Sequence, residues 1–167
     1  MITKKSKSIN LVRTGVFAGL SGGVAEIVWI ALYKNIAGGN AASVAQGVTE
    51  TLFPNIQSTA IAVPLGIFIH MSIAVALGMA IAILVRSWLP RTEAKLVEPV
   101  VVIGLLSAIW AVNFYLILPA VNPAFVTLVP YSVSLISKVL FGCAAALTLQ
   151  FIDRPLKATG RNLKGVV

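Results

Sequence analysis

The sequence predicts an all-α fold, an integral membrane four-helix bundle with both termini in the cytoplasm. Composition is the first observation, since 58% of the 167 residues are hydrophobic, 11% are charged and the mean hydropathy is +0.95. Soluble domains are about half apolar and about a quarter charged. The second observation is a set of four long apolar stretches, and the third is the confinement of basic residues to alternate connections.

The apolar stretches define the expected spans. A helix needs about 20 apolar residues to cross the hydrocarbon layer. We expect a single transmembrane domain, residues 1–167, with spans at approximately 12–33, 60–85, 97–118 and 125–152 and an outer loop at 34–59. Apolar residues recur at helical spacing in this loop, which predicts either a short helix along the outer membrane surface or a packed loop. The stretch LPAVNPAF before the fourth span predicts a tight hairpin.

Lysine and arginine predict the orientation. They lie before the first span, between the second and third, and after the fourth, whereas the other two connections contain only Lys34. The residues are Lys4, Lys5, Lys7, Arg13, Arg86, Arg91, Lys95, Arg154, Lys157, Arg161 and Lys164. By the positive-inside rule, the termini and the middle loop are cytoplasmic in a multi-pass protein of the bacterial inner membrane. The net charge of +8 therefore reflects topology and does not predict nucleic-acid binding, which requires basic residues clustered on a polar folded surface.

Small residues recur at helical spacing on one face of three spans. Such stripes let helix backbones approach closely, so they predict the helix-packing faces. They contain Gly15, Gly19, Gly22 and Gly23 in the first span, Gly66, Ala74 and Gly78 in the second, and Gly142 in the fourth. Glu26 follows Gly22 by four residues, and His70 and Lys138 lie within the other two stripes. We therefore expect these three side chains to point toward protein and away from lipid.

Four polar residues interrupt the spans at a similar depth. Glu26, His70, Asn113 and Lys138 lie about 6 to 11 residues from the outer ends of their spans, or roughly 9 to 17 Å at 1.5 Å per residue. A charge at the bilayer centre costs at least about 2.5 kcal/mol. We therefore predict an intramembrane polar cluster in which Glu26 pairs with Lys138, while His70 and Asn113 supply hydrogen bonds.

Three interpretations of this cluster stay open. The first is a structural clamp that fixes the helix register, because buried ion pairs specify packing without doing chemistry. The second is a proton or ion relay, since ionisable residues inside a membrane are functional candidates by default. In the third, Glu26 or Lys138 pairs with a residue of another subunit.

No catalytic, metal or cofactor site is predicted. The chain has one histidine and one cysteine, Cys143, so bis-histidine haem ligation and cysteine metal clusters are excluded within a single chain. A metal or cofactor site that His70 shares with another chain stays open. Ser134 and Ser137 lie near Lys138 in the sequence, but serines in membrane helices usually bond to their own backbone or to a neighbour. We therefore expect no enzymatic activity from this chain alone.

The stretches IWAVNFYLILPAVNPAF and LVPYSVSLISK are the most distinctive parts of the sequence. In its plan of four spans and short loops, the chain resembles small bacterial inner-membrane proteins, and no functional residue is carried over from that resemblance. The leading hypothesis is a noncatalytic accessory subunit of a larger membrane complex of the respiratory or membrane monooxygenase type. Its partners are then other membrane subunits and lipid, with a homo-oligomer as another possibility. The alternative is a small oligomeric proton or ion transporter that uses Glu26, His70 and Lys138.

Overall fold

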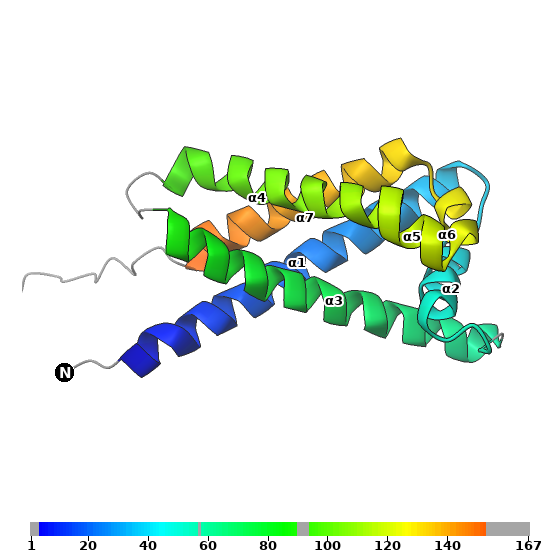
Figure 1. Cartoon of the computed structure of the whole chain (residues 1–167), viewed down its shortest axis with the longest axis horizontal. Coiled ribbons are helices and arrows are strands. Elements are labelled where there is room, and N and C mark those ends of the chain that lie inside the picture. Colours follow the sequence, from blue (N-terminus) through cyan, green and yellow to red (C-terminus); the bar gives the residue numbers. More distant parts are fainter. Residues whose placement is uncertain (1–3, 57, 90–93, 153–167) are drawn as a thin grey trace, which may run out of the picture.

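The structure is a computed structural model that describes residues 4–56, 58–89 and 94–152, and every regular element in this part of the chain is helical (Figure 1). The elements are α1 (Lys4–Ile36), α2 (Ala41–Leu52), α3 (Thr59–Trp88), α4 (Ala94–Val112), the π-helical turn η1 (Asn113–Ile117), α5 (Leu118–Val121), α6 (Pro123–Leu128) and α7 (Tyr131–Ile152). Helix α1 begins and α7 ends at one end of the molecule, which we call the terminal end. The short helices α2 and α6 lie at the opposite end, which we call the capped end.

Four helical segments are long and apolar enough to cross a membrane. They are Leu11–Ile36, Thr59–Trp88, Val97–Val121 and Tyr131–Ile152. The prediction of an all-helical fold with four such segments is therefore confirmed. Of the basic residues used for orientation, Arg91, Arg154, Lys157, Arg161 and Lys164 lie outside the described residues, as do the side chains of Lys4, Lys5, Lys7 and Lys95.

The fourth apolar helix begins later than the sequence suggested, at Tyr131 instead of Phe125. Val129 has φ −134° and ψ 123°, an extended conformation that separates α6 from α7. The residue before a proline is pushed out of the helical region by the proline ring, so Pro130 accounts for the break. The expected hairpin thus contains two short helices, α5 and α6, joined at Asn122, whose side chain accepts a hydrogen bond from Phe125 N.

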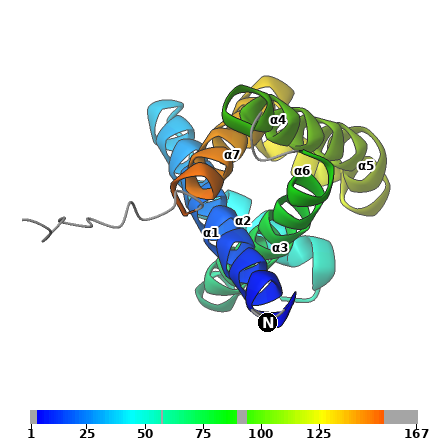
Figure 2. The same ribbon diagram turned by 90° about the vertical axis from the view of Figure 1, so that its left-hand side faces the viewer.

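Helix α1 packs against both α3 and α7, and α4 packs against α7 (Figure 2). The order around the bundle is therefore α3, α1, α7, α4. Helices α3 and α4 are close at the terminal end and diverge toward the capped end (Figure 1). The bundle is closed along three of its four seams and open along part of the fourth.

The glycine stripe of α1 explains the close packing of α1 and α3. A Cβ atom at Gly15 would lie 2.6 Å from Met79 Cα, and one at Gly23 would lie 2.8 Å from Ala74 Cβ. Gly19 and Gly78 face each other so closely that a Cβ on either would overlap the other helix's backbone. Gly22 points instead toward Phe141 of α7. The predicted packing face is thus used within the chain.

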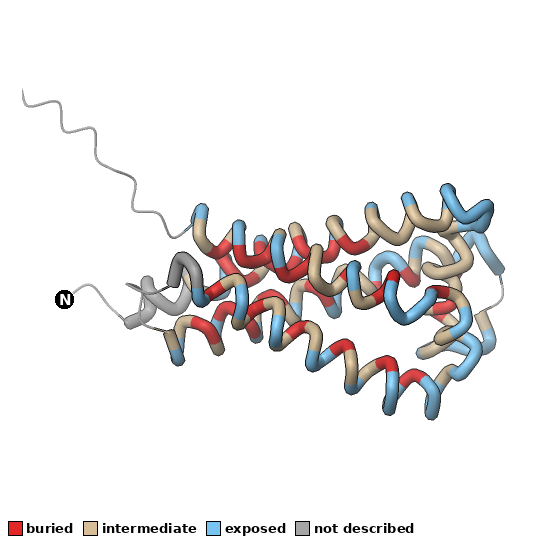
Figure 3. The backbone as a smooth tube through the Cα atoms, turned by 90° about the horizontal axis from the view of Figure 1, so that it is seen from above, coloured by how far each residue is buried: buried red, intermediate tan, exposed pale blue. Residues whose placement is uncertain are grey.

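Buried residues lie along the inward faces of the helices, as the red segments of the backbone in Figure 3 show. The largest cluster fills the half of the bundle near the terminal end, and Gly142 of α7 packs there against Ile103 of α4. The cluster contains Ala18, Ala74, Ile81, Ala82, Val85, Val102, Leu106, Phe141, Ala145, Ala146 and Leu149. A second cluster, Trp110, Phe114 and Leu118, lies nearer the capped end.

Helix α2 resolves the alternative left open for the outer loop. Asn40 caps its first turn by accepting a hydrogen bond from Ala42 N at 2.9 Å. The buried Thr49 hydroxyl donates to the Ala62 carbonyl of α3 at 2.6 Å, and Gly66 lets the backbone of α3 approach Ala45 directly. Helix α2 is therefore docked onto α3 and forms a cover over the capped end.

Candidate functional site

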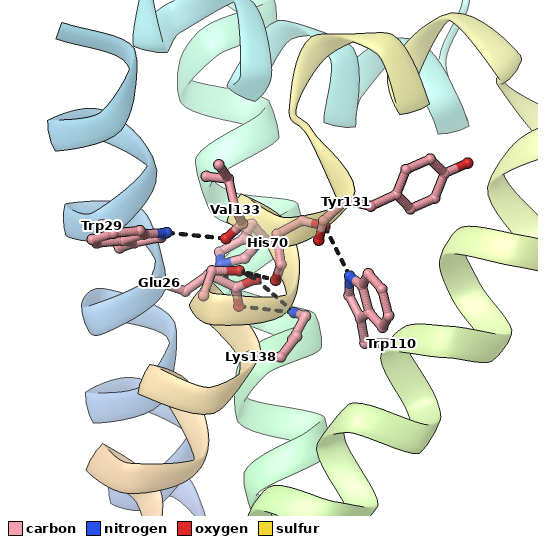
Figure 4. A network of polar contacts seen from close by, with 9 residues as sticks. Glu26, Trp29, His70, Trp110, Tyr131, Val133 and Lys138 are labelled. Atoms are coloured by element: carbon pink, nitrogen blue, oxygen red, sulfur yellow. Dashed lines mark hydrogen bonds and ion pairs between the residues drawn. The ribbon is translucent and has the colours of Figure 1, made fainter. Parts of the chain in front are cut away.

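Glu26 and Lys138 form an ion pair between α1 and α7 (Figure 4). Lys138 Nζ lies 2.7 Å from Glu26 Oε1 and 2.9 Å from Oε2, so it contacts both carboxylate oxygens. Glu26 is 7% exposed and its partner is half-buried. The small Gly22 precedes Glu26 by one turn and lets α7 approach closely enough for the two side chains to meet.

Ser137 adds a second contact from α7 to the same carboxylate. Its buried hydroxyl lies 3.0 Å from Glu26 Oε1 and 2.7 Å from the carbonyl oxygen of Ser134. Both neighbours are acceptors, so the single hydroxyl proton serves one of them at a time. Both contacts fit the expectation that such a serine bonds to its own backbone or to a neighbour, but the sequence did not show that the neighbour would be Glu26.

His70 of α3 lies beside the ion pair. Its Nε2 atom is 3.7 Å from Glu26 Oε2, which is too long for a hydrogen bond. This nitrogen is buried and has no hydrogen-bond partner among the described residues. The structure therefore brings Glu26, His70 and Lys138 together, and the imidazole keeps an unused hydrogen-bonding atom.

Asn113 is the one member of the predicted cluster that does not join it. It begins the π-helical turn η1 on the far side of the bundle, and no hydrogen bond links its side chain to Glu26, His70 or Lys138 in the described part of the chain. Short π-helical turns widen a helix locally and often occur at functional sites. Here the turn holds Asn113 at the wall of the cavity described below.

Two tryptophans hold the first turns of α7 in place (Figure 4). Trp29 Nε1 of α1 donates to the Val133 carbonyl at 3.0 Å, and Trp110 Nε1 of α4 donates to Ser134 Oγ at 2.8 Å. Because Ser137 and Lys138 follow directly, these bonds position the α7 side of the cluster. Indole N–H groups in apolar surroundings require an acceptor, but the sequence does not show which one.

A cavity of about 460 Å³ lies between the polar cluster and the capped end. Its walls come from α1, α2, α3, η1, α5, α6 and α7 and are mainly apolar. Its polar lining consists of Glu26, His70, Asn113, Ser134, Ser137, Lys138 and Thr51. Two wall residues of α3, Ile67 and Ile73, are 42% and 52% exposed, so the cavity extends to the side of the bundle.

The cavity ends at the polar cluster. Beyond it, toward the terminal end, the space between the helices is filled by the larger apolar cluster, which includes Ala74, Leu106 and Phe141. The described residues therefore form a pocket that ends at the polar cluster, and not a continuous polar path.

A second buried ion pair was not foreseen. Arg86 near the end of α3 contacts Glu98 near the start of α4, with Nη1 2.8 Å from Oε2 and Nη2 3.4 Å from Oε1. Glu98 is fully buried. A carboxylate at the start of an apolar span, following a short connection from an arginine, is the signal that would have predicted it.

The described residues contain no group of three or more histidine, cysteine, aspartate or glutamate side chains that could hold a metal ion. Cys143 is exposed on α7. Comparisons of the chain with protein families, curated proteins and solved structures gave no match.

Proposed function

We propose that this protein binds a small, mainly apolar molecule from the surrounding membrane. The observation that carries this proposal is the cavity of about 460 Å³, whose apolar walls lead to the Glu26, His70 and Lys138 cluster. Sites for small molecules are typically about 300 to 1,000 Å³, largely apolar, with a few convergent polar groups. The cavity has that size and that distribution of polarity.

A structural clamp explains the ion pair but not the space beside it. Protein interiors are close-packed and hold few voids larger than a water molecule. A pair that serves only to fix the register of α1 and α7 needs no adjoining cavity. The combination of a buried polar cluster with open apolar space therefore favours binding.

We place the protein in a bacterial inner membrane, with the terminal end in the cytoplasm. The support for this is the distribution of lysine and arginine along the sequence, which favours the terminal end. The capped end then faces outward, and the cavity opens within the outer half of the bilayer.

The roles expected from the sequence have less support. The glycine stripe that suggested an accessory subunit is occupied by α3 and α7, so it offers no free face to a partner. A proton or ion path would need a route past the apolar cluster around Phe141. An accessory role remains a prediction, tested by which proteins copurify with the untagged chain from its native membrane.

The binding proposal is tested by filling the cavity. Ala31 of α1 lines the cavity, and Ala108 of α4 is exposed outside it. The native protein and the variants Ala31→Phe and Ala108→Phe are purified from membranes, and the copurifying small molecules are identified by mass spectrometry of an organic extract. We expect one molecule enriched over bulk lipid in the native protein and in Ala108→Phe, and lost in Ala31→Phe. No enrichment, or enrichment that survives Ala31→Phe, contradicts the proposal.

A further inference from the structure

Two polar groups on the cavity wall lack a partner. The Nε2 atom of His70 is buried and has no hydrogen bond, and the side-chain amide of Asn113 makes none within the described part of the chain. Both residues belong to helices that are apolar enough to lie in a bilayer, where no water compensates an unused donor or acceptor. A ligand in the cavity can supply hydrogen bonds to both.

The charges of the site are already matched. Lys138 contacts both carboxylate oxygens of Glu26, and Ser137 is within bonding distance of one of them. The pair therefore offers neither a free cation to an anionic head group nor a free carboxylate to a cationic one. A charged ligand would have to break this pair, which is costly where solvent is scarce. A neutral ligand leaves it intact.

The apolar walls determine the rest of the ligand. Ile30, Val48, Ile69 and Leu118 surround the space with aliphatic side chains, which suit a hydrocarbon tail. The exposed Ile67 and Ile73 place part of this wall at the side of the bundle, where lipid-soluble molecules arrive. The cavity therefore fits a molecule that is already dissolved in the membrane.

We infer that the cavity binds a neutral, lipid-soluble molecule whose carbonyl or hydroxyl head group is held by His70 and Asn113. This inference rests on the proposed binding function and adds the class of ligand and the two residues that select it. Imidazole nitrogens and carboxamides both bond to such head groups. The Glu26 and Lys138 pair, which lies beside His70, then excludes charged analogues of the same ligand.

Four probes with matched tails test this inference: decanamide, decanoate, decylammonium and decane. Their binding to the full chain in detergent is measured by native mass spectrometry and titration calorimetry. We expect decanamide to form a one-to-one complex and to bind at least about tenfold more tightly than either ion. Decane should bind weakly, because it fills the apolar walls but leaves His70 and Asn113 without partners.

Variants of His70 and Asn113 test whether these two residues bind the head group of the ligand. His70→Phe and Asn113→Leu should each weaken decanamide binding about tenfold and leave decane binding unchanged, since they remove a hydrogen bond and keep the volume. His70→Gln restores a hydrogen-bonding group and should recover part of the affinity. Asn55→Leu, an exposed change outside the cavity, is the matched control.

The outcomes separate the inference from the function on which it rests. If none of the four probes binds, the binding function itself is contradicted. If decane binds but an ion binds as tightly as decanamide, or if both variants bind decanamide normally, the function stands and the assigned ligand class is wrong. Should His70→Phe fail to fold, Asn113→Leu and His70→Gln still decide the matter.

Discussion

Lys138 Nζ lies within 3 Å of both carboxylate oxygens of Glu26, at 2.7 and 2.9 Å, and this contact joins the second half of α1 to the first half of α7. The contact requires both helices to hold these residues at the same depth and on facing sides. A shift of either helix by one residue would move its side chain about 1.5 Å along the axis and turn it away from its partner. The pair therefore fixes the register of α1 against α7.

Removing one member of this pair is expected to be worse than removing both. Glu26→Leu leaves the Lys138 ammonium uncompensated in apolar surroundings and should lower the free energy of unfolding by about 3 to 5 kcal/mol. The double variant Glu26→Leu with Lys138→Met leaves no stranded charge and should recover most of that loss. The free energy of unfolding of the native protein, both single variants and the double variant is measured in mixed detergent micelles by circular dichroism, as a double-mutant cycle. Additive losses would show that the two side chains do not interact.

Adding one methyl group to the α1–α3 contact should destabilise the bundle. Gly19→Ala places a Cβ against the carbonyl group of Ala74, and such overpacking costs about 1 to 3 kcal/mol. Gly104 of α4 is the matched control, because a Cβ there meets nothing within 4 Å. Gly104→Ala should be neutral or stabilise the helix by up to about 1 kcal/mol. The midpoints of thermal unfolding of the two variants compare them directly, and equal midpoints would disprove the close contact.

The Glu98 carboxylate is expected to be essential for joining α3 to α4. Glu98→Gln removes the buried charge that the guanidinium of Arg86 contacts, so stability should fall by about 3 kcal/mol or more. Glu50→Gln is the control, since Glu50 is half-buried and accepts a hydrogen bond from Gln46 at 2.9 Å. That change should stay within about 0.5 kcal/mol of the native protein. A loss for Glu98→Gln as small as that of the control would show that the pair contributes no stability.

The docking of α2 should depend on one hydroxyl group. Thr49→Val removes the 2.6 Å hydrogen bond to the Ala62 carbonyl, which is worth about 1 kcal/mol, and should speed hydrogen exchange in α2 more than in α1. Thr127→Val is the control, because the exposed Thr127 donates to the Ala124 carbonyl of its own helix. Unchanged protection of α2 in Thr49→Val would mean that the glycine contacts alone hold the helix.

Much of the fold and part of the candidate site could be predicted from the sequence. Helix geometry converts a residue count into a depth, so the common level of Glu26, His70 and Lys138 follows from their places in the spans. Spacing also places Gly15, Gly19 and Gly23 on one face. The spacing does not show which helix packs against this face. Small residues of α3, such as Ala74 and Gly78, fit the face, and so would a helix of another subunit.

Other features depend on tertiary packing that no local pattern shows. The π-helical turn that begins at Asn113 adds a residue to a helical turn without any distinctive sequence, and Asn113 lies at the cavity wall. The cavity itself is lined by residues of α1, α2, α3, η1, α5, α6 and α7, so it belongs to no single segment. Pro130 was a signal for the break between α6 and α7, but the apolar residues on both sides of it led to the prediction of one span from residue 125.

The glycine contact between α1 and α3 also limits how the molecule moves. Where two backbones touch without intervening side chains, there are no rotamers to repack, and sliding one helix past the other separates every contact at once. These two helices thus behave as a rigid frame. We therefore expect any movement that admits or releases the proposed ligand to occur in the other helices. These are α4, which diverges from α3, and α2 and α6, which cover the capped end.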